Sequence, residues 1–193
     1  MYYSGHSSKT GPFGTGFILL KKMQNYVIGF GSCNERLCKL RLKGKYSNVT
    51  LINIYASTED HTEEIKEQFC DNLQYLLDKT PKNDVIVILG DVNAQLGKER
   101  LYNEVTGQHT LHEEANRNGE LLREFACANN MVVISTNFDH ERVQKITWLS
   151  PYQTTASHID HIIINANKKG NRRCKNYERP QPGFRPFLSQ RSN

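Results

Sequence analysis

The chain has 193 residues, a formal net charge of +5, 37% hydrophobic residues, 23% charged residues and a mean hydropathy of −0.63. These values suit one globular domain and exclude a disordered or fibrous chain. Residues 85–89 form an uncharged apolar run far too short to span a bilayer, so we expect no membrane partner. Five cysteines without a Cys-x-x-Cys pair argue against a disulfide framework or a zinc knuckle. We therefore expect an intracellular location, with the nucleus included.

The positive charge is concentrated in the last part of the chain. Residues 168–193 hold eight Lys or Arg and one acidic residue, which leaves 17 basic and 19 acidic residues elsewhere. Such a segment either attracts a polyanion or stays unpacked. We expect a domain over residues 1–165 and a basic, disordered tail over residues 166–193.

The first part of the chain predicts strands followed by a helix. Alternating, β-branched segments predict strands over residues 14–20, 27–30, 37–42 and 49–55. Apolar residues at spacings of three and four then predict a helix that begins near Glu59 and Asp60 and ends at Thr80, before Pro81.

The second part of the chain continues this mixed pattern. Residues 85–89 are continuously apolar, which is typical of a strand buried on both faces. A helix is expected from near Asn118 to Asn129, and the further expected strands cover residues 131–134, 146–148 and 159–164. Strands on both sides of two helices predict an α/β domain.

The segment Gly90-Asp91-Val92-Asn93 follows the buried strand directly. Ligands of α/β sheets bind at the carboxyl ends of strands, and a spacing of two can turn Asp91 and Asn93 to one side. An Asp can orient or deprotonate an attacking water, and an Asn can donate to a phosphate oxygen. The alternative interpretation is an Asx-rich turn after a strand.

A second polar segment, Ser157-His158-Ile159-Asp160-His161, introduces an apolar strand. A carboxylate in such a strand needs a partner, and orienting an imidazole is one possibility. A spacing of three on a strand would send His158 and His161 to opposite faces, which disfavours a metal site. His109 and His112 are expected to be solvated.

Tyr55 ends the strand predicted over residues 49–55. Its hydroxyl could contact a phosphate, or its ring could be an interfacial aromatic. The pattern alone leaves both interpretations open.

Together these segments resemble the endonuclease/exonuclease/phosphatase family, and within it the LINE-retrotransposon endonuclease branch. The family's NxYxP strand end resembles residues 53–57, and its GDFN motif resembles residues 90–93. Its helix start, with the pattern N-x-N-G followed by L-x-x-F, resembles residues 116–125, and its TW-x-SP and S-x-IDHI motifs resemble residues 147–151 and 157–162. The motifs keep their order over roughly residues 14–164.

This resemblance implies a four-layer α/β/β/α sandwich and a Mg²⁺-dependent phosphodiesterase that acts on DNA or another phosphodiester. Asp91 would orient or deprotonate the attacking water, and Asn93 and Tyr55 would hold the phosphate. Asp160 would align a catalytic histidine. Trp148 would pack near the site or stack on a base. We expect Tyr55, Asp91, Asn93 and Asp160 to surround one cleft.

Two motifs of the family have no counterpart in the sequence. These are the Gln-Glu-Thr motif, which supplies the metal-binding glutamate, and the Ser-Asp-His motif, which supplies the terminal histidine. We therefore expect a family domain that is incomplete at both ends and impaired in catalysis. The alternative is a catalytically silent, retrotransposon-derived remnant or a nucleic-acid-binding fragment.

Overall fold

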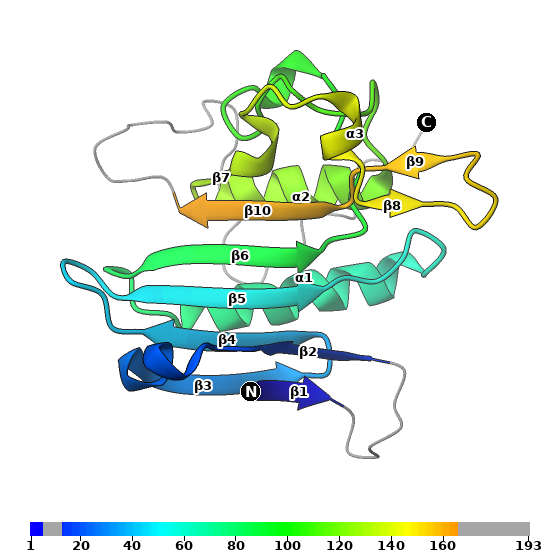
Figure 1. The fold of residues 1–193 in the computed structure, drawn as a ribbon. Coiled ribbons are helices and arrows are strands. Elements are labelled where there is room, and N and C mark those ends of the chain that lie inside the picture. The colour runs from blue at the N-terminus through cyan, green and yellow to red at the C-terminus, as the bar shows by residue number, and fades with distance from the viewer. Residues whose placement is uncertain (6–12, 166–193) are drawn as a thin grey trace.

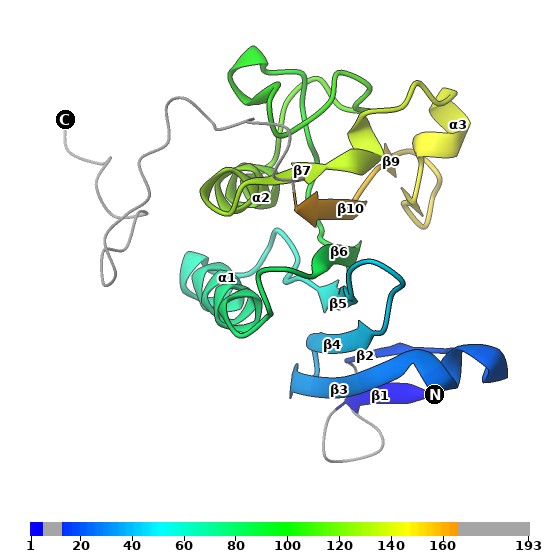
Figure 2. The same ribbon diagram turned by 90° about the vertical axis from the view of Figure 1, so that its left-hand side faces the viewer.

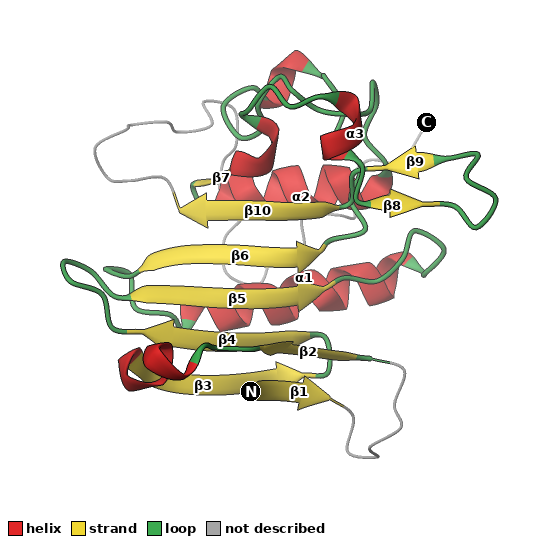
Figure 3. Cartoon of the chain, viewed as in Figure 1, coloured by secondary structure: helices red, strands yellow, loops and turns green. Residues whose placement is uncertain are grey.

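The computed structural model describes residues 1–5 and 13–165 (Figure 1). The basic tail expected over residues 166–193 therefore lies outside the described residues. The helices and strands, coloured by type in Figure 3, are β1 (Tyr2–Gly5), β2 (Gly14–Phe17), η1 (Lys21–Tyr26), β3 (Val27–Asn34), β4 (Leu37–Leu42), β5 (Val49–Tyr55), α1 (Glu63–Asp78), β6 (Val85–Asp91), η2 (Arg100–Tyr102), α2 (Arg117–Ala128), β7 (Met131–Val133), η3 (Ile134–Thr136), α3 (Arg142–Lys145), β8 (Trp148–Leu149), β9 (Ala156–Ser157) and β10 (Asp160–Asn165).

A six-stranded sheet forms the centre, in the order β3-β4-β5-β6-β10-β7. β5 and β6 are parallel, and β10 pairs antiparallel with β6. The carboxyl ends of β5 and β6 and the first residue of β10 consequently meet at one end of the sheet (Figure 1). We call this the site end.

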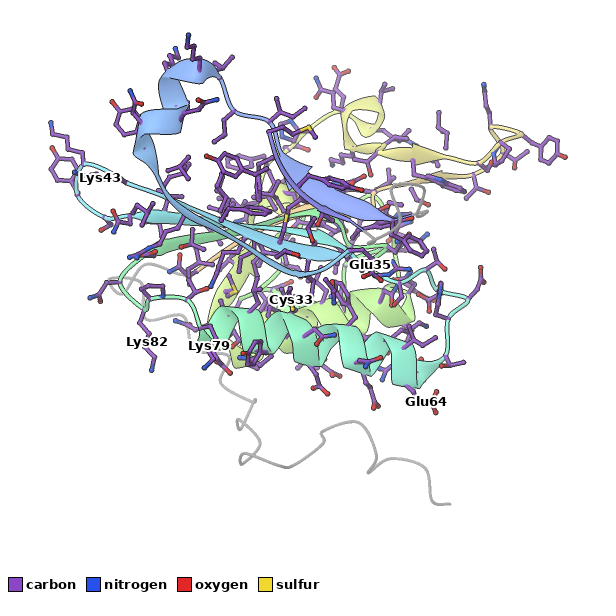
Figure 4. The ribbon with its side chains drawn as sticks, turned by 90° about the horizontal axis from the view of Figure 1, so that it is seen from below. Cys33, Glu35, Lys43, Glu64, Lys79 and Lys82 are labelled. Atoms are coloured by element: carbon purple, nitrogen blue, oxygen red, sulfur yellow. The ribbon has the colours of Figure 1, made fainter. Side chains whose placement is uncertain are left out.

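Helices α1 and α2 cover one face of this sheet (Figure 2). Alternate side chains of the strands, such as Ile52, Ile88 and Ile163, are fully buried in the core against these helices. The small β1–β2 sheet lies on the opposite face, over β3 to β5 (Figure 4). Phe17 packs there on Cys38 and Leu40. The described residues thus form α/β/β layers, and the predicted mixed α/β fold class is confirmed.

The strands predicted over residues 37–42 and 49–55 have the observed bounds. The strand predicted over residues 14–20 ends earlier, at Phe17, because its partner β1 begins at Tyr2, which is the register partner of Phe17. β1 itself, β9 and the short helix α3 were not predicted. In the described part of the chain no helix is both long and apolar enough to cross a membrane. Cys33, Cys38 and Cys70 are free thiols.

Candidate active site

Three of the residues predicted for the site lie side by side on neighbouring strands. Asp91, the last residue of β6, is the register partner of Tyr55 at the end of β5. Asp91 is also the register partner of Asp160, the first residue of β10. Register partners direct their side chains to the same face of a sheet, which here is the face opposite α1 and α2. The sheet topology therefore brings Tyr55, Asp91 and Asp160 together.

Gly90 allows the strand to reach this position. It has a φ of +131°, and a Cβ atom there would clash with the carbonyl oxygen of Ile54. No residue with a side chain fits without moving the β5 backbone. The backbone conformation at position 90 therefore requires a glycine.

The Asp91 carboxylate is held by the turn that follows it. Its Oδ1 accepts a hydrogen bond of 2.9 Å from the backbone N–H of Asn93. Burial, and secondarily the charge of Asp160, raise the pKa of Asp91, and this hydrogen bond opposes the rise. A carboxylate with a raised pKa is a stronger base than an ordinary one.

Asn93 adopts a left-handed backbone conformation, with a φ of +50°, which an Asn tolerates better than most residues. Its side-chain Nδ2 donates to the carbonyl oxygen of Ala56 at 3.0 Å, so one of its two amide hydrogens is already engaged. The backbone N–H of Ala56 in turn donates to the Asp91 carbonyl oxygen at 2.8 Å. Asn93 thus links the segments that follow β5 and β6, and one N–H of its side chain remains for a ligand.

The N-terminus of α2 supports this turn. The Nδ2 groups of Asn116 and Asn118 donate to the carbonyl oxygen of Asn93 at 3.1 and 3.2 Å. Asn116 also caps α2, because its Oδ1 accepts from the backbone N–H of Gly119 at 2.8 Å. The sequence pattern matched both Asn residues to the family, but their hydrogen bonds to the Asp91–Asn93 turn emerge only in the fold.

Tyr55 is the neighbour of Asp91 on β5, and its ring centre lies 5.8 Å from that of Phe13. No hydrogen bond to its hydroxyl occurs within residues 1–5 and 13–165. Its ring centre lies 5.1 Å from the guanidinium carbon of Arg36, the residue directly before β4. Arg36 was not predicted as a site residue, since a lone Arg in a turn carries no sequence signal.

Asp160 is held at the start of β10 by Thr147, whose Oγ1 accepts the backbone N–H of Ile159 at 3.0 Å and that of Asp160 at 3.2 Å. No histidine ring is hydrogen-bonded to the Asp160 carboxylate within the described residues, so the expected alignment of a histidine stays a prediction. Trp148, on β8, is 44% exposed, and a packing role for it is not supported.

The expected arrangement of the histidines is wrong in two respects. The rings of His158 and His161 lie 4.5 Å apart, because His158 precedes β10 and does not follow the alternation of the strand. His112 is partly buried, and its Nε2 accepts the backbone N–H of His158 at 3.2 Å. His161 is 2% exposed, with Nε2 at 2.9 Å from the Ala94 carbonyl oxygen and Nδ1 at 3.0 Å from the Ser135 hydroxyl. With both of its nitrogens engaged, His161 is a structural residue.

A hollow of about 490 Å³ lies next to Asp160 on the same face of the sheet. Leu89 and Ile162 form part of its floor, and Phe138, His140 and Lys145 are among its other lining residues. The site end therefore combines two carboxylates with an adjacent recess that mixes apolar and polar groups.

The oxygen donors at the site end supply only part of a binding site for a divalent cation. Among the residues that the structure describes, no group of three or more His, Cys, Asp or Glu side chains could hold a metal ion. Asp91 and Asp160 form a pair of hard oxygen donors, however, and Mg²⁺ is often held by one or two carboxylates together with phosphate oxygens of the substrate. A carboxylate of this pair is therefore a donor that Mg²⁺ shared with a phosphate ligand would accept.

Comparison with known proteins identifies sequence relatives. No protein-family model matches the chain. It is 36% identical over 163 residues to craniofacial development protein 2 of Tragulus javanicus and to that of Bos taurus. The match covers 84% of this chain, but only 28% and 27% of the two relatives. The chain thus spans less than a third of their length.

Solved structures with partial similarity include the endonuclease domain of TRAS1, a telomere-specific non-LTR retrotransposon. The two chains are 14% identical with a TM-score of 0.46, and the match covers 68% of this chain and 51% of that one. The AP endonuclease LMAP of Leishmania major has 12% identity, a TM-score of 0.45 and coverage of 69% and 46%. TDP2 of D. rerio, complexed with a single-strand DNA product, has 12% identity, a TM-score of 0.47 and coverage of 75% and 54%.

Proposed function

We propose that this chain hydrolyses phosphodiester bonds in DNA with the help of Mg²⁺. The chain is a homologue of craniofacial development protein 2 and carries motifs of the endonuclease/exonuclease/phosphatase family. The observation that carries the proposal is the register that aligns Tyr55, Asp91 and Asp160 across three strands. A phosphodiesterase needs a base for water, donors for the phosphate and a counter-charge in one place.

Each site residue has a role that follows from its contacts. Asp91, whose pKa is raised by burial and by Asp160, accepts the proton of the attacking water. The free N–H of the Asn93 side chain and the Tyr55 hydroxyl donate to the phosphate oxygens. Asn116 and Asn118 act as positioning residues, because they hold the Asn93 backbone without facing the reacting atoms.

Asp160 would hold Mg²⁺ jointly with the phosphate, because the one oxygen of Asp91 that is not bonded to Asn93 serves as the base. Bound there, the cation supplies positive charge against the charge that develops on the phosphate. We propose a low rate for the 193-residue chain tested by itself, because its sequence has neither the Gln-Glu-Thr nor the Ser-Asp-His motif. Binding of Mg²⁺ through one carboxylate is also weaker than binding through a larger ligand set.

The test is nicking of supercoiled plasmid DNA in Mg²⁺, with EDTA as the metal-free arm. Asp91→Asn keeps the size of the side chain and removes the base, so we expect activity to fall roughly 10²–10⁴-fold. Asp71→Asn makes the same substitution on an exposed position of α1 and should leave the rate unchanged.

Two outcomes would refute hydrolysis at this site. Nicking that is equal in the wild type and in Asp91→Asn would place the activity elsewhere or in a contaminant. An absence of nicking together with tight DNA binding would favour the alternative, a silent nucleic-acid-binding fragment of retrotransposon descent.

A further inference from the structure

Arg36 is tied to the site end by both its backbone and its side chain. Its carbonyl oxygen accepts the backbone N–H of Tyr55 at 2.9 Å. Its Nη1 donates to the carbonyl oxygens of Tyr55 at 3.3 Å and Ala56 at 3.2 Å. Asn93 donates to the same Ala56 oxygen, so the guanidinium belongs to the network that holds the Asp91–Asn93 turn.

Two aromatic rings fix the plane of this guanidinium. Its central carbon lies 4.0 Å from the ring centre of Phe13 and 5.1 Å from that of Tyr55, and the two rings are 5.8 Å apart. Arginine held against aromatic faces loses little further conformational freedom when it binds a ligand. The group is therefore preorganised.

The count of donors leaves one edge of Arg36 unused. A guanidinium has five N–H groups, and the two carbonyl contacts engage only Nη1. Within residues 1–5 and 13–165, Nε and Nη2 have no hydrogen-bond partner, and no carboxylate forms an ion pair with Arg36. The Nε–Nη2 edge is the one that binds a carboxylate or a phosphate through two parallel hydrogen bonds.

The charge at the site end makes such an edge useful. Asp91 and Asp160 place two negative charges where a phosphodiester, itself an anion, would bind. The guanidinium of Arg36, whose central carbon lies 5.1 Å from the centre of the Tyr55 ring, offsets part of this repulsion before any metal is present. If Arg36 only held this turn in place, the two hydrogen bonds donated by its Nη1 would be sufficient.

We infer that Arg36 is a phosphate-binding residue, which holds a phosphodiester group of the substrate through its Nε–Nη2 edge. This inference rests on the proposed function, because it assigns the substrate's phosphate to that site. A purely structural role, in which Arg36 only holds the β3–β4 turn against β5, is the competing explanation.

The test measures binding of the dinucleotide d(TpT), which carries one phosphodiester and too little charge to be held by a basic tail alone. Binding is followed by NMR titration in EDTA, so that no cleavage occurs. We expect Arg36→Gln to weaken binding roughly 10- to 100-fold, as the loss of a charge-assisted pair of hydrogen bonds predicts. Arg36→Lys should recover only part of the affinity, because Lys keeps the charge and loses the planar edge.

Lys82→Gln is the matched control, since it removes one positive charge at the end of the molecule opposite Glu35, the neighbour of Arg36 (Figure 4). It should bind d(TpT) as the wild type does. A second measurement needs no variant to fold: the Nε–H resonance of Arg36 in the wild type should shift as d(TpT) is added.

An unshifted Nε–H resonance, or equal binding by the wild type and Arg36→Gln, would overturn the inference and leave a structural role. Plasmid nicking that depends on Asp91 would still support the proposed function in that case. Conversely, Arg36-dependent binding of d(TpT) without Asp91-dependent nicking would support the phosphate site and refute hydrolysis.

Discussion

The Cα atoms of Asp91 and Asp160 are register partners across β6 and β10, so two carboxylates lie beside each other at the site end of the sheet. Together with burial, the charge of Asp160 raises the pKa of Asp91. Like charges brought together in this way cost folding free energy, and natural proteins accept such a cost mainly where the residues serve a function.

Asp91→Asn should therefore stabilise the protein at neutral pH while its activity falls roughly 10²–10⁴-fold. A raised pKa means that the folded chain keeps a proton that the unfolded chain has already lost, so the stability of the wild type falls as pH rises through that window. Urea unfolding in EDTA should show the variant more stable than the wild type at pH 7 and equal to it at low pH. A less stable variant at pH 7 would contradict this electrostatic account.

The buried His161 should make the protein sensitive to acid. Burial lowers the pKa of His161 to about 3, whereas an unfolded chain titrates near the usual value of about 6.5. Between these values only the unfolded chain takes up the proton, so stability is lost as pH falls through this window. His161→Gln, which can still donate to Ala94 and accept from Ser135, should flatten this loss.

The measurement is the free energy of unfolding in urea at pH 7, 6, 5 and 4, compared between the wild type and His161→Gln. Burial also lowers the pKa values of His112 and His158, so part of the slope should remain in the variant. Identical slopes would show that His161 does not carry the effect.

Asn118 should affect activity without touching the substrate. Its Nδ2 donates to the carbonyl oxygens of Ser57 at 2.9 Å and Asn93 at 3.2 Å, and the residue is buried. Asn118→Ala should cost about 1–3 kcal/mol of stability, because it leaves buried carbonyls with fewer donors. We expect kcat for plasmid nicking to fall with little change in KM, because the displaced turn carries Asp91.

Asn116→Asp is the matched comparison for this prediction. It keeps the oxygen that caps α2 at Gly119, and it replaces the N–H that reaches Asn93 with a charged carboxylate oxygen that cannot donate. Unchanged kcat in both variants would show that the turn is held without the help of α2.

Arg123 should be required for the loop between β6 and α2. The residue is 1% exposed, and its side chain donates to the carbonyl oxygen of Gly97 at 2.7 Å and to the carboxylate of Glu99. This pairing holds the pKa of Glu99 at about 2. Arg123→Met should cost about 2–3 kcal/mol, because charged hydrogen bonds to the loop are lost.

Hydrogen exchange checks the Arg123 prediction. The backbone amide of Ala115 in this loop donates to Glu99 at 3.0 Å. This amide and others in the loop should exchange faster in Arg123→Met, whereas the amides that pair β5 with β6 should keep their protection. Uniform acceleration across the chain would indicate general destabilisation and would contradict a local role.

Much of the candidate site could be predicted from short sequence patterns. Tyr55 and Asp91 end strands whose apolar residues are visible in the sequence, and Gly90 precedes Asp91 because only glycine fits its backbone. The family motifs then identified Asn93 and Asp160 as their companions. Whether these residues perform catalysis stays a prediction.

Other contacts could not be predicted because they join segments far apart in the chain. Arg36 reaches Tyr55 and Ala56 only after β4 pairs with β5, and Thr147 reaches Asp160 only after β10 joins the sheet. The spacing of His158 and His161 misled for a related reason: alternation holds only inside a strand, and β10 begins after His158.

The amino-acid sequence by itself determined where strands and helices form, since hydrophobic periodicity and the positions of glycine and proline act over a few residues. It also predicted which side chains are candidates for the chemistry. The tertiary structure decided which of them meet, because strand order and register depend on hydrogen bonds between distant segments. It thereby placed Asp91 between Tyr55 and Asp160, with the guanidinium of Arg36 beside the Tyr55 ring.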